Sequence, residues 1–317
     1  MADGLRSGEH CKLMSAEKPV DAVPRSAAEG QSSILVVAEG QPGDASALSK
    51  AATLAGRSGA RIELFRCEAE LEYELRHAYE SSGADRARGE AVTAARDYLE
   101  SLRLSVGLGA ERVSTAAACD SPSYEGVLHK VQQSRPDMVI KTARDGDGRR
   151  RFIVDPNDWE LMRSCPIPLM LTSARPWGVP ARFAAAVDVS AEETPRLTRA
   201  ILHTCRSLVQ ACQAELDLLY CERSGTEPDA AAGYAATLRS LAEEFQIGSN
   251  HVHMFTGDAA TVLPAFAGAQ RYDVLALGAL SHKRSLVALV GTLTGRLVDS
   301  VDCDFLLVRA DQESRRA

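Results

Sequence analysis

The residues of this sequence best suited to chemistry are a glycine behind a strand-like run and a Gly-Thr pair farther along the chain. Gly278 follows residues 273–277, and Gly291 and Thr292 stand thirteen residues later, where a helical pattern begins. A helix start offers unpaired backbone N–H groups and the positive end of the helix dipole to an anion. Two interpretations are open on these residues alone. Gly278 and Gly291 serve only a turn and helix packing, or they form a phosphate site, which requires a strand that ends before Gly278 and a helix that begins after Thr292.

Signatures of several common enzyme classes are absent. The sequence contains no G-x-x-x-x-G-K-[ST] loop, no G-x-G-x-x-G fingerprint and no G-x-S-x-G elbow. Their absence disfavours P-loop ATPases, dinucleotide-dependent dehydrogenases and α/β-hydrolases. Because no residue stands out as a general base, we expect a noncatalytic protein. Slow ATP hydrolysis is the enzymatic alternative that stays open.

Composition excludes further classes of function. The net charge of -7 argues against general nucleic-acid binding, which depends on clustered Lys and Arg. No segment reaches the roughly 20 apolar residues of a membrane helix, and the charged N-terminus lacks the apolar core of a secretory signal. The eight cysteines include no C-x-x-C pair, so we predict no metal site and no disulfide framework. We expect a cytoplasmic protein without a membrane span.

Two histidines raise a separate question about metals. His251 and His253 alternate along a predicted strand and so face the same side. One interpretation is a metal site. Because no third ligand stands nearby in the sequence, a solvated or packed strand face is the favoured interpretation.

The elements that must position the phosphate site occur twice. Corresponding strand patterns are found at residues 34–39 and 183–188, 137–141 and 273–277, and 168–172 and 304–308. The last two pairs share an offset of 136 residues, which indicates a duplicated unit. Within each copy, strands alternate with helical patterns, which predicts parallel sheets covered on both faces. The predicted fold class is α/β, with two tandem doubly wound parallel-sheet domains.

The predicted boundaries follow from this repeat. Residues 1–32 and 311–317 are predicted flexible tails, and the two domains are predicted at residues 33–174 and 181–310. The first strands, at residues 34 and 183, are offset by 149 residues, whereas the later strands are offset by 136. The first domain is therefore longer by about 13 residues. We place these extra residues near 71–89.

The second copy of the duplicated unit resembles a known family. Gly278-Ala-Leu-Ser281, nine residues, and then Gly291-Thr292 is similar to the phosphate-binding signature of the universal stress protein family. The whole arrangement resembles the tandem two-domain members, over roughly residues 33–309. The resemblance implies the adenine nucleotide alpha hydrolase-like fold. It also implies ATP, with Mg, as the ligand of the second domain.

The resemblance further assigns site residues. Asp188 would contact the adenine or ribose, Cys221 would line the base pocket, and the helix start at Gly291 would hold the phosphates. The complete implied set is Ala186, Val187, Asp188, Cys221, Leu277, Gly278, Ser281, Gly291, Thr292, Leu293 and Thr294. Ser281 and Arg284 depart from the family pattern, which has glycines there. Glycine adopts positive φ freely, whereas serine and arginine do so at a cost.

The first domain departs further from the signature. Thr142 replaces the first glycine, and Asp155-Pro156 replaces the Gly-Thr pair, with Asp158 in the first helical turn. Asp as N-cap and Pro at the first helical position favour a helix start capped by its own side chains. These carboxylates would repel an anion. We therefore expect no phosphate binding in the first domain.

Two functions from different classes follow. The leading interpretation is a noncatalytic stress-response protein in which ATP or a related nucleotide acts as a regulatory ligand on unknown protein partners. The alternative is a binder or sensor of an apolar or lipid-like metabolite between the domains. In single-domain members of the family two copies pair, and the resemblance implies that this chain supplies both copies itself, as an internal pseudo-dimer joined through strands at residues 168–172 and 304–308.

Overall fold

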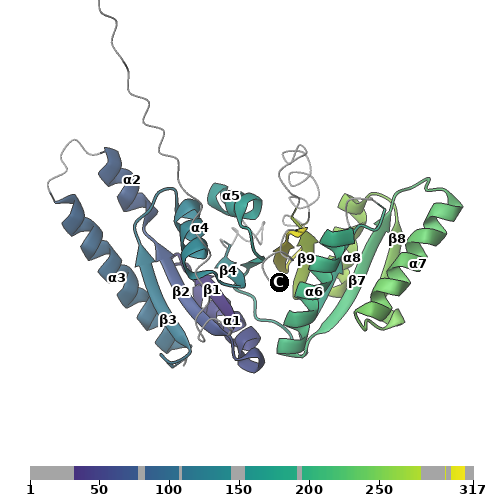
Figure 1. Cartoon of the computed structure of the whole chain (residues 1–317), viewed down its shortest axis with the longest axis horizontal. Coiled ribbons are helices and arrows are strands. Elements are labelled where there is room, and N and C mark those ends of the chain that lie inside the picture. The colour runs from purple at the N-terminus through teal and green to yellow at the C-terminus, as the bar shows by residue number, and fades with distance from the viewer. Residues whose placement is uncertain are drawn as a thin grey trace, which may run out of the picture. The chain divides into compact units, whose positions relative to one another are not determined.

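A single sheet of ten strands organises the chain. The computed structural model describes residues 32–77, 83–106, 109–143, 154–190, 195–279, 297 and 301–310. The strands of the first half are β1 (Ser33–Val37), β2 (Arg61–Cys67), β3 (Val113–Ala118), β4 (Met138–Thr142) and β5 (Leu169–Thr172). Those of the second half are β6 (Arg182–Ala186), β7 (Glu215–Glu222), β8 (Val252–Thr256), β9 (Val274–Gly278) and β10 (Asp304–Val308). The strand order is β3-β2-β1-β4-β5-β10-β9-β6-β7-β8 (Figure 1).

Each half of the sheet has the same internal order. Within the first half, strands β1 to β5 pair only in parallel with one another. Within the second half, strands β6 to β10 do the same. The first strand of each half, β1 or β6, lies between the second and the fourth. The predicted α/β class with two doubly wound parallel sheets is therefore confirmed. The domain boundaries at residues 33–174 and 181–310 stay a prediction.

Helices cover both faces of the sheet. They are α1 (Asp44–Ser58), α2 (Ala69–His77), α3 (Ala84–Ser105), α4 (Ser123–Ser134), α5 (Pro156–Ser164), α6 (Pro195–Cys212), α7 (Pro228–Glu244) and α8 (Ala259–Gln270). One buried apolar cluster takes side chains from α1, α3, α6 and α7, and the other takes them from α4, α5 and α8. We call these the α6 face and the α8 face. Helix α2 lies where the sequence predicted the extra residues of the first half.

The two halves are joined by their last strands, as the resemblance implied. Strands β5 and β10 pair antiparallel, with Leu171 opposite Phe305 and Leu169 opposite Leu307. Each buried cluster contains residues of both halves, for example Met170 of β5 and Leu306 of β10 on the α6 face. The apolar core is thus continuous across the junction, and the expected internal pseudo-dimer is confirmed at this pair of strands.

A buried ion pair reinforces the junction. The Nζ atom of Lys50 in α1 lies 2.8 Å from the Asp304 carboxylate at the start of β10, and both side chains are almost fully buried. The backbone N–H of Ser173 and the indole N–H of Trp177 also donate to Asp304, at 2.9 and 2.7 Å. Burial raises the pKa of Asp304 and lowers the pKa of Lys50, although their mutual attraction opposes both changes. Removing one partner would leave the other charge buried and alone.

The linker between the halves is held by a second carboxylate. Asp273, which precedes β9, accepts hydrogen bonds from the backbone N–H groups of Gly178 and Arg182, at 3.1 and 2.9 Å. Trp177, in the same linker, packs edge-on against Phe183 with ring centroids 5.5 Å apart. Trp177 is therefore a packing residue of the linker. Over the described stretches of chain, no helix has both the length and the apolar character to cross a membrane.

The ion pair at the junction gives a first testable prediction. Lys50→Met should lower the free energy of unfolding by about 3 to 5 kcal/mol, because it leaves the buried Asp304 carboxylate without its cationic partner. Urea titration followed by circular dichroism measures the loss. The matched control is Arg86→Met, since the Arg86–Glu90 pair lies on an exposed helix surface and should contribute little. Equal losses in the two variants would contradict the importance of the buried pair.

Candidate functional site

Three neighbouring strand ends of the second half bring most of the predicted site residues together. Strand β6 lies between β9 and β7 and is parallel to both, so their carboxyl ends share one edge of the sheet. Ala186 ends β6, with Asp188 two residues beyond it. Gly278 ends β9, and Cys221 lies near the end of β7. Chain connections run in opposite directions from β6 and β9, and ligands of doubly wound sheets bind at such switch points.

The rest of the predicted phosphate cradle lies outside the described residues. Ser281, Gly291, Thr292, Leu293 and Thr294 belong to this group, as does the whole loop 281–284. Of the helix expected at residues 293–301, Leu297 and Val301 are described. Both are buried in the cluster of the α8 face. The assignment of the cradle residues stays a prediction.

Gly278 ends β9 beneath a side chain of α6. A Cβ atom added to Gly278 would lie 2.6 Å from Cδ2 and 3.1 Å from Cγ of Leu197, in the first turn of α6. Gly278 shows no positive φ, so glycine is required here for space and not for backbone conformation. In the first half the relation is reversed: a Cβ atom on Gly43, before α1, would lie 2.4 Å from Cγ2 of Thr142 at the end of β4.

Asp188 presents its carboxylate at the surface of this edge. Its Oδ1 atom accepts hydrogen bonds from the backbone N–H and the hydroxyl of Ser190, at 2.8 and 2.6 Å, so that it shapes its own turn. The side chain is exposed, and the described part of the chain places no basic group in ion-pair contact with it. Asp188 can therefore accept hydrogen bonds from hydroxyl or amino groups of a ligand.

A cavity adjoins Asp188 on the α6 face. It has a volume of about 370 Å³ and lies between α6 and α7. Val189 and Leu241 supply apolar lining, and Thr237 and Ser240 supply hydroxyl groups. This volume is within the range of small-molecule sites in proteins.

The structure gives Cys221 a structural contact. Its thiol donates to the carbonyl of Gly257 in the loop after β8, at 3.7 Å. Cys67, at the end of β2 in the first half, donates in the same way to the carbonyl of Asp120 after β3, at 3.3 Å. Burial raises the pKa of the Cys221 thiol and raises that of Cys67 to about 12. Because the contact occurs in both halves, it ties two loops together independently of any nucleotide.

The switch point of the first half is filled by charged side chains. Lys141 in β4 is 1% exposed, and its Nζ atom lies 2.6 Å from Asp158 and 2.8 Å from Glu39. Burial lowers the pKa of Lys141, but the carboxylates of Asp158 and Glu39 outweigh it and hold that pKa above its ordinary value. An ammonium group with two carboxylates beside it needs no anionic ligand.

The helix start in the first half is capped as the sequence predicted. The Asp155 side chain accepts from the backbone N–H of Asp158, the Asp158 side chain accepts from the backbone N–H of Asp155, and Pro156 occupies the first position of α5. These contacts satisfy N–H groups that an anion would otherwise use. At the position of Lys141, with the repeat offset of 136, the second half has Leu277. The second half therefore has no cation at this strand position.

The paired histidines hold a carboxylate. His251 and His253 contact the two oxygens of Asp217 in β7, at 2.5 and 3.1 Å, and the Tyr272 hydroxyl donates to the same group. His251 lies in a short 3-10 turn (Ser249–His251) before β8, and not in the strand as predicted. The favoured interpretation of a packed strand face is confirmed by these contacts. Within the described ranges, no cluster of three His, Cys, Asp or Glu side chains could hold a metal ion.

Sequence reasoning missed Lys141 and Leu197. A signal for Lys141 was present, since a lysine inside an otherwise apolar strand requires a buried partner. Of its two partners, Asp158 was predicted only as part of a capped helix start, and nothing in the sequence pattern paired it with Lys141. Leu197 gave no signal, because a leucine in an amphipathic helix is ordinary.

Comparison with known proteins points to one family. Residues 32–173 match the model of the universal stress protein family. Universal stress protein E of Escherichia coli K12 is 24% identical over 298 residues, covering 88% of this chain and 94% of that protein. The Universal stress protein E homolog of Haemophilus influenzae is 23% identical over 212 residues, or 61% of this chain and 69% of that protein.

Solved structures show the same fold. A putative universal stress protein from Pseudomonas aeruginosa UCBPP-PA14 has a TM-score of 0.69 at 24% identity, covering 88% of this chain and 94% of that one. A universal stress protein from Archaeoglobus fulgidus has a TM-score of 0.65 at 10% identity, covering 89% and 97%. At these identities the likeness concerns the fold and does not extend to ligands.

The filled switch point of the first half gives a second prediction. Lys141→Met should lower the free energy of unfolding by about 3 to 5 kcal/mol, because it leaves the fully buried Asp158 carboxylate without its cation. The double variant Lys141→Met/Asp158→Asn removes both charges and should be more stable than the single variant. Urea titration of the three proteins tests the coupling. If the double variant lost the sum of two independent effects, Lys141 and Asp158 would not act as a pair.

Proposed function

We propose that this chain is a stress-response protein of the universal stress protein family, whose model matches residues 32–173, and that it binds ATP or a related adenine nucleotide in its second half. The nucleotide acts as a regulatory ligand, and the protein performs no catalysis. As part of the same proposal we place the protein in the cytoplasm.

The difference between the two switch points is the observation that carries this proposal. In the first half, Lys141 is enclosed by Glu39 and Asp158. In the second half, Leu277 replaces the lysine and Asp188 is exposed at the edge of the sheet. The first half thus neutralises its buried lysine with its own carboxylates, and the second half presents a carboxylate to a ligand.

Each residue of the proposed site has its own part in binding. Asp188 accepts hydrogen bonds from the ribose hydroxyls or the amino group of the base. Gly278 lets Leu197 pack against the end of β9, which fixes the first turn of α6 beside the proposed site. Gly291 and Thr292 provide backbone N–H groups and a hydroxyl for the phosphates, in the manner of a helix start. Mg²⁺ arrives with the nucleotide, because proteins bind this ion largely through phosphate oxygens and water.

Binding acts by a shift in conformational populations. A ligand favours the conformation that it binds best, by as much as its affinities for the alternatives differ. Here that conformation brings the loop and helix start at residues 278–294 onto the nucleotide. The surface presented to a partner protein changes with it, and this is how a noncatalytic binder regulates.

An apolar or lipid-like ligand between the halves is the alternative expected from the sequence. The structure gives this alternative less support, because the continuous core fills the junction at β5 and β10. The cavity beside Asp188 lies within the second half and carries hydroxyl groups. Mass spectrometry of material released on denaturing the purified protein separates the two: adenine nucleotide supports the proposal, and a lipid alone would refute it.

Calorimetry tests the proposed binding site. The intact protein should bind Mg-ATP, and Gly291→Asp should bind it at least ten-fold more weakly, because a carboxylate at the helix start repels the phosphates. The control is Gly268→Asp, on the exposed surface of α8, where an added Cβ meets nothing within 4 Å. This control should bind like the intact protein. If titration of the intact protein with Mg-ATP gave no heat of binding, the proposal would be refuted.

A further inference from the structure

Strand β8 is the outermost strand of the second half. Among the described strands it pairs only with β7. The backbone N–H of Gly257, just after β8, donates to the carbonyl of Glu222 in β7 at 2.8 Å. Because backbone N–H groups point to alternate sides along a strand, those of Val252, Met254 and Thr256 point away from β7. The edge therefore presents a row of backbone groups that no described strand pairs.

The side chains of β8 favour pairing with a further strand. The strand contains no Lys, Glu, Asp, Gly or Pro, and Met254 at its centre is 41% exposed. On the α8 face the half-buried rings of His253, Phe255 and Phe266 contact one another. The ring centroids are 4.6 Å apart for the two phenylalanines and 5.0 Å apart for His253 and Phe266. These rings form an apolar surface beside the edge, on which side chains of an added strand can pack.

The opposite edge of the sheet, β3, carries smaller side chains. Thr115 of β3 and Val252 of β8 each pair with the fourth residue of the neighbouring strand. Residues 116–118 of β3 therefore correspond to residues 253–255 of β8. The former are all alanine, whereas the latter are His, Met and Phe. Alanine is depleted in strands and offers little surface to a partner.

A charge also protects the β3 edge. Lys130 of α4 stands at the position of Phe266 of α8, with the repeat offset of 136. Its Nζ atom lies 2.5 Å from the carboxylate of Glu63 in β2, the strand next to β3. Charged side chains at an edge, lysine above all, hinder pairing with another chain. The β8 edge has an aromatic ring in place of this lysine.

Helix α7 restricts what can pair with β8. It packs over β8 on the α6 face, where Val252 joins the cluster that contains Leu238 and Leu241 of α7. If two copies of the chain paired antiparallel through β8, their α7 helices would lie on the same face, one strand spacing or roughly 5 Å apart. Packed helices need about 8 to 10 Å between their axes. A second copy therefore does not fit this edge, whereas a single extended segment does.

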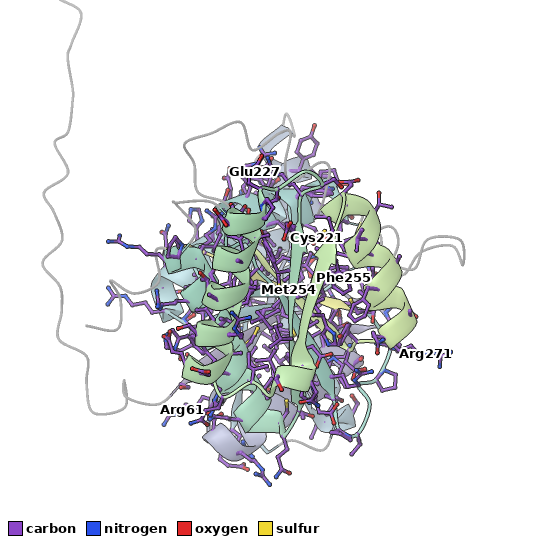
Figure 2. All side chains as sticks on the ribbon, turned by 90° about the vertical axis from the view of Figure 1, so that its right-hand side faces the viewer. Arg61, Cys221, Glu227, Met254, Phe255 and Arg271 are labelled. Carbon is purple, nitrogen blue, oxygen red and sulfur yellow. The ribbon has the colours of Figure 1, made fainter. Side chains whose placement is uncertain are left out.

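The charges at the two ends of β8 indicate the charges of the partner. Glu222 and Glu227 lie at the carboxyl end with Arg223 between them in the chain, and Arg271 follows α8 at the amino end. Figure 2 looks onto this edge and shows Glu227 and Arg271 on opposite sides of Met254. A segment that runs antiparallel to β8 is complementary if its amino end is basic and its carboxyl end is acidic.

We propose that the β8 edge binds an extended segment of a partner protein, which joins the sheet as an antiparallel strand beyond β8. The segment is basic at its amino end, acidic at its carboxyl end and alternately apolar between them. Its backbone pairs with Met254 and the neighbouring residues, and one row of its side chains packs on Phe255 and Phe266. This binding is independent of a nucleotide, because β8 is not one of the strands at the switch point.

A synthetic peptide tests the edge. The probe is a capped, fluorescently labelled peptide with a lysine pair, an alternating valine and threonine centre, and a glutamate pair. It should bind the intact protein, as measured by fluorescence anisotropy. Met254→Lys should weaken this binding by at least about ten-fold, because it places a charge at the centre of the edge. The matched control Ala117→Lys, at the corresponding position of β3, should bind the peptide like the intact protein.

Hydrogen exchange gives an independent readout. The peptide should slow amide exchange at Val252, Met254 and Thr256 by at least about ten-fold and leave β3 unchanged. No binding by the intact protein, equal affinity of the two lysine variants, or protection at β3 in place of β8 would overturn the proposal. Sedimentation of the chain without peptide supplies a further outcome: a dimer that Met254→Lys abolishes would assign the edge to a second copy, and would also overturn it.

Discussion

The antiparallel pairing of β5 with β10 is the interaction on which the rest of the structure depends. Each half is a parallel sheet whose last strand would otherwise be an open edge, and such an edge is prone to pair with another chain. Pairing the two edges merges the cores of both halves on both faces of the sheet. Because β5 and β10 run in opposite directions, the carboxyl ends of the strands in one half lie on the same side of the sheet as the amino ends of the strands in the other half. The two switch points are therefore separated and can diverge independently.

Their divergence follows a simple electrostatic logic. A buried ammonium group is costly unless carboxylates stand beside it, and Lys141 has two of them. Once this group is in place, the first half has no need of a ligand and offers no room for an anion. The second half carries Leu277 at the corresponding position, so its strand end is neutral and Asp188 faces outward. The two copies thus differ in charge at corresponding strand ends.

Some of this was predictable from the sequence because it depends on local patterns. Equal offsets predicted which strands of the two copies correspond, and Asp155-Pro156 predicted a capped helix start in the first half. The pairing of the last strands was implied by the resemblance and not by the offsets. The role of Lys141 was not predictable in the same way, because its partner Glu39 lies 102 residues away in the sequence. The face that Cys221 occupies depends on strand register, and the contact of Leu197 with Gly278 depends on how α6 packs. The predictions at Ser281 and Gly291 lie outside the described residues and stay predictions.

The number of nucleotides bound per chain tests the central claim most directly. Equilibrium dialysis of the intact protein against labelled ATP and Mg²⁺, at saturating nucleotide, measures it. One nucleotide per chain is the result expected from a closed first half and an open second half. Two per chain would show that Lys141 and its carboxylates do not close the first site, and none would show that the second half is no nucleotide site.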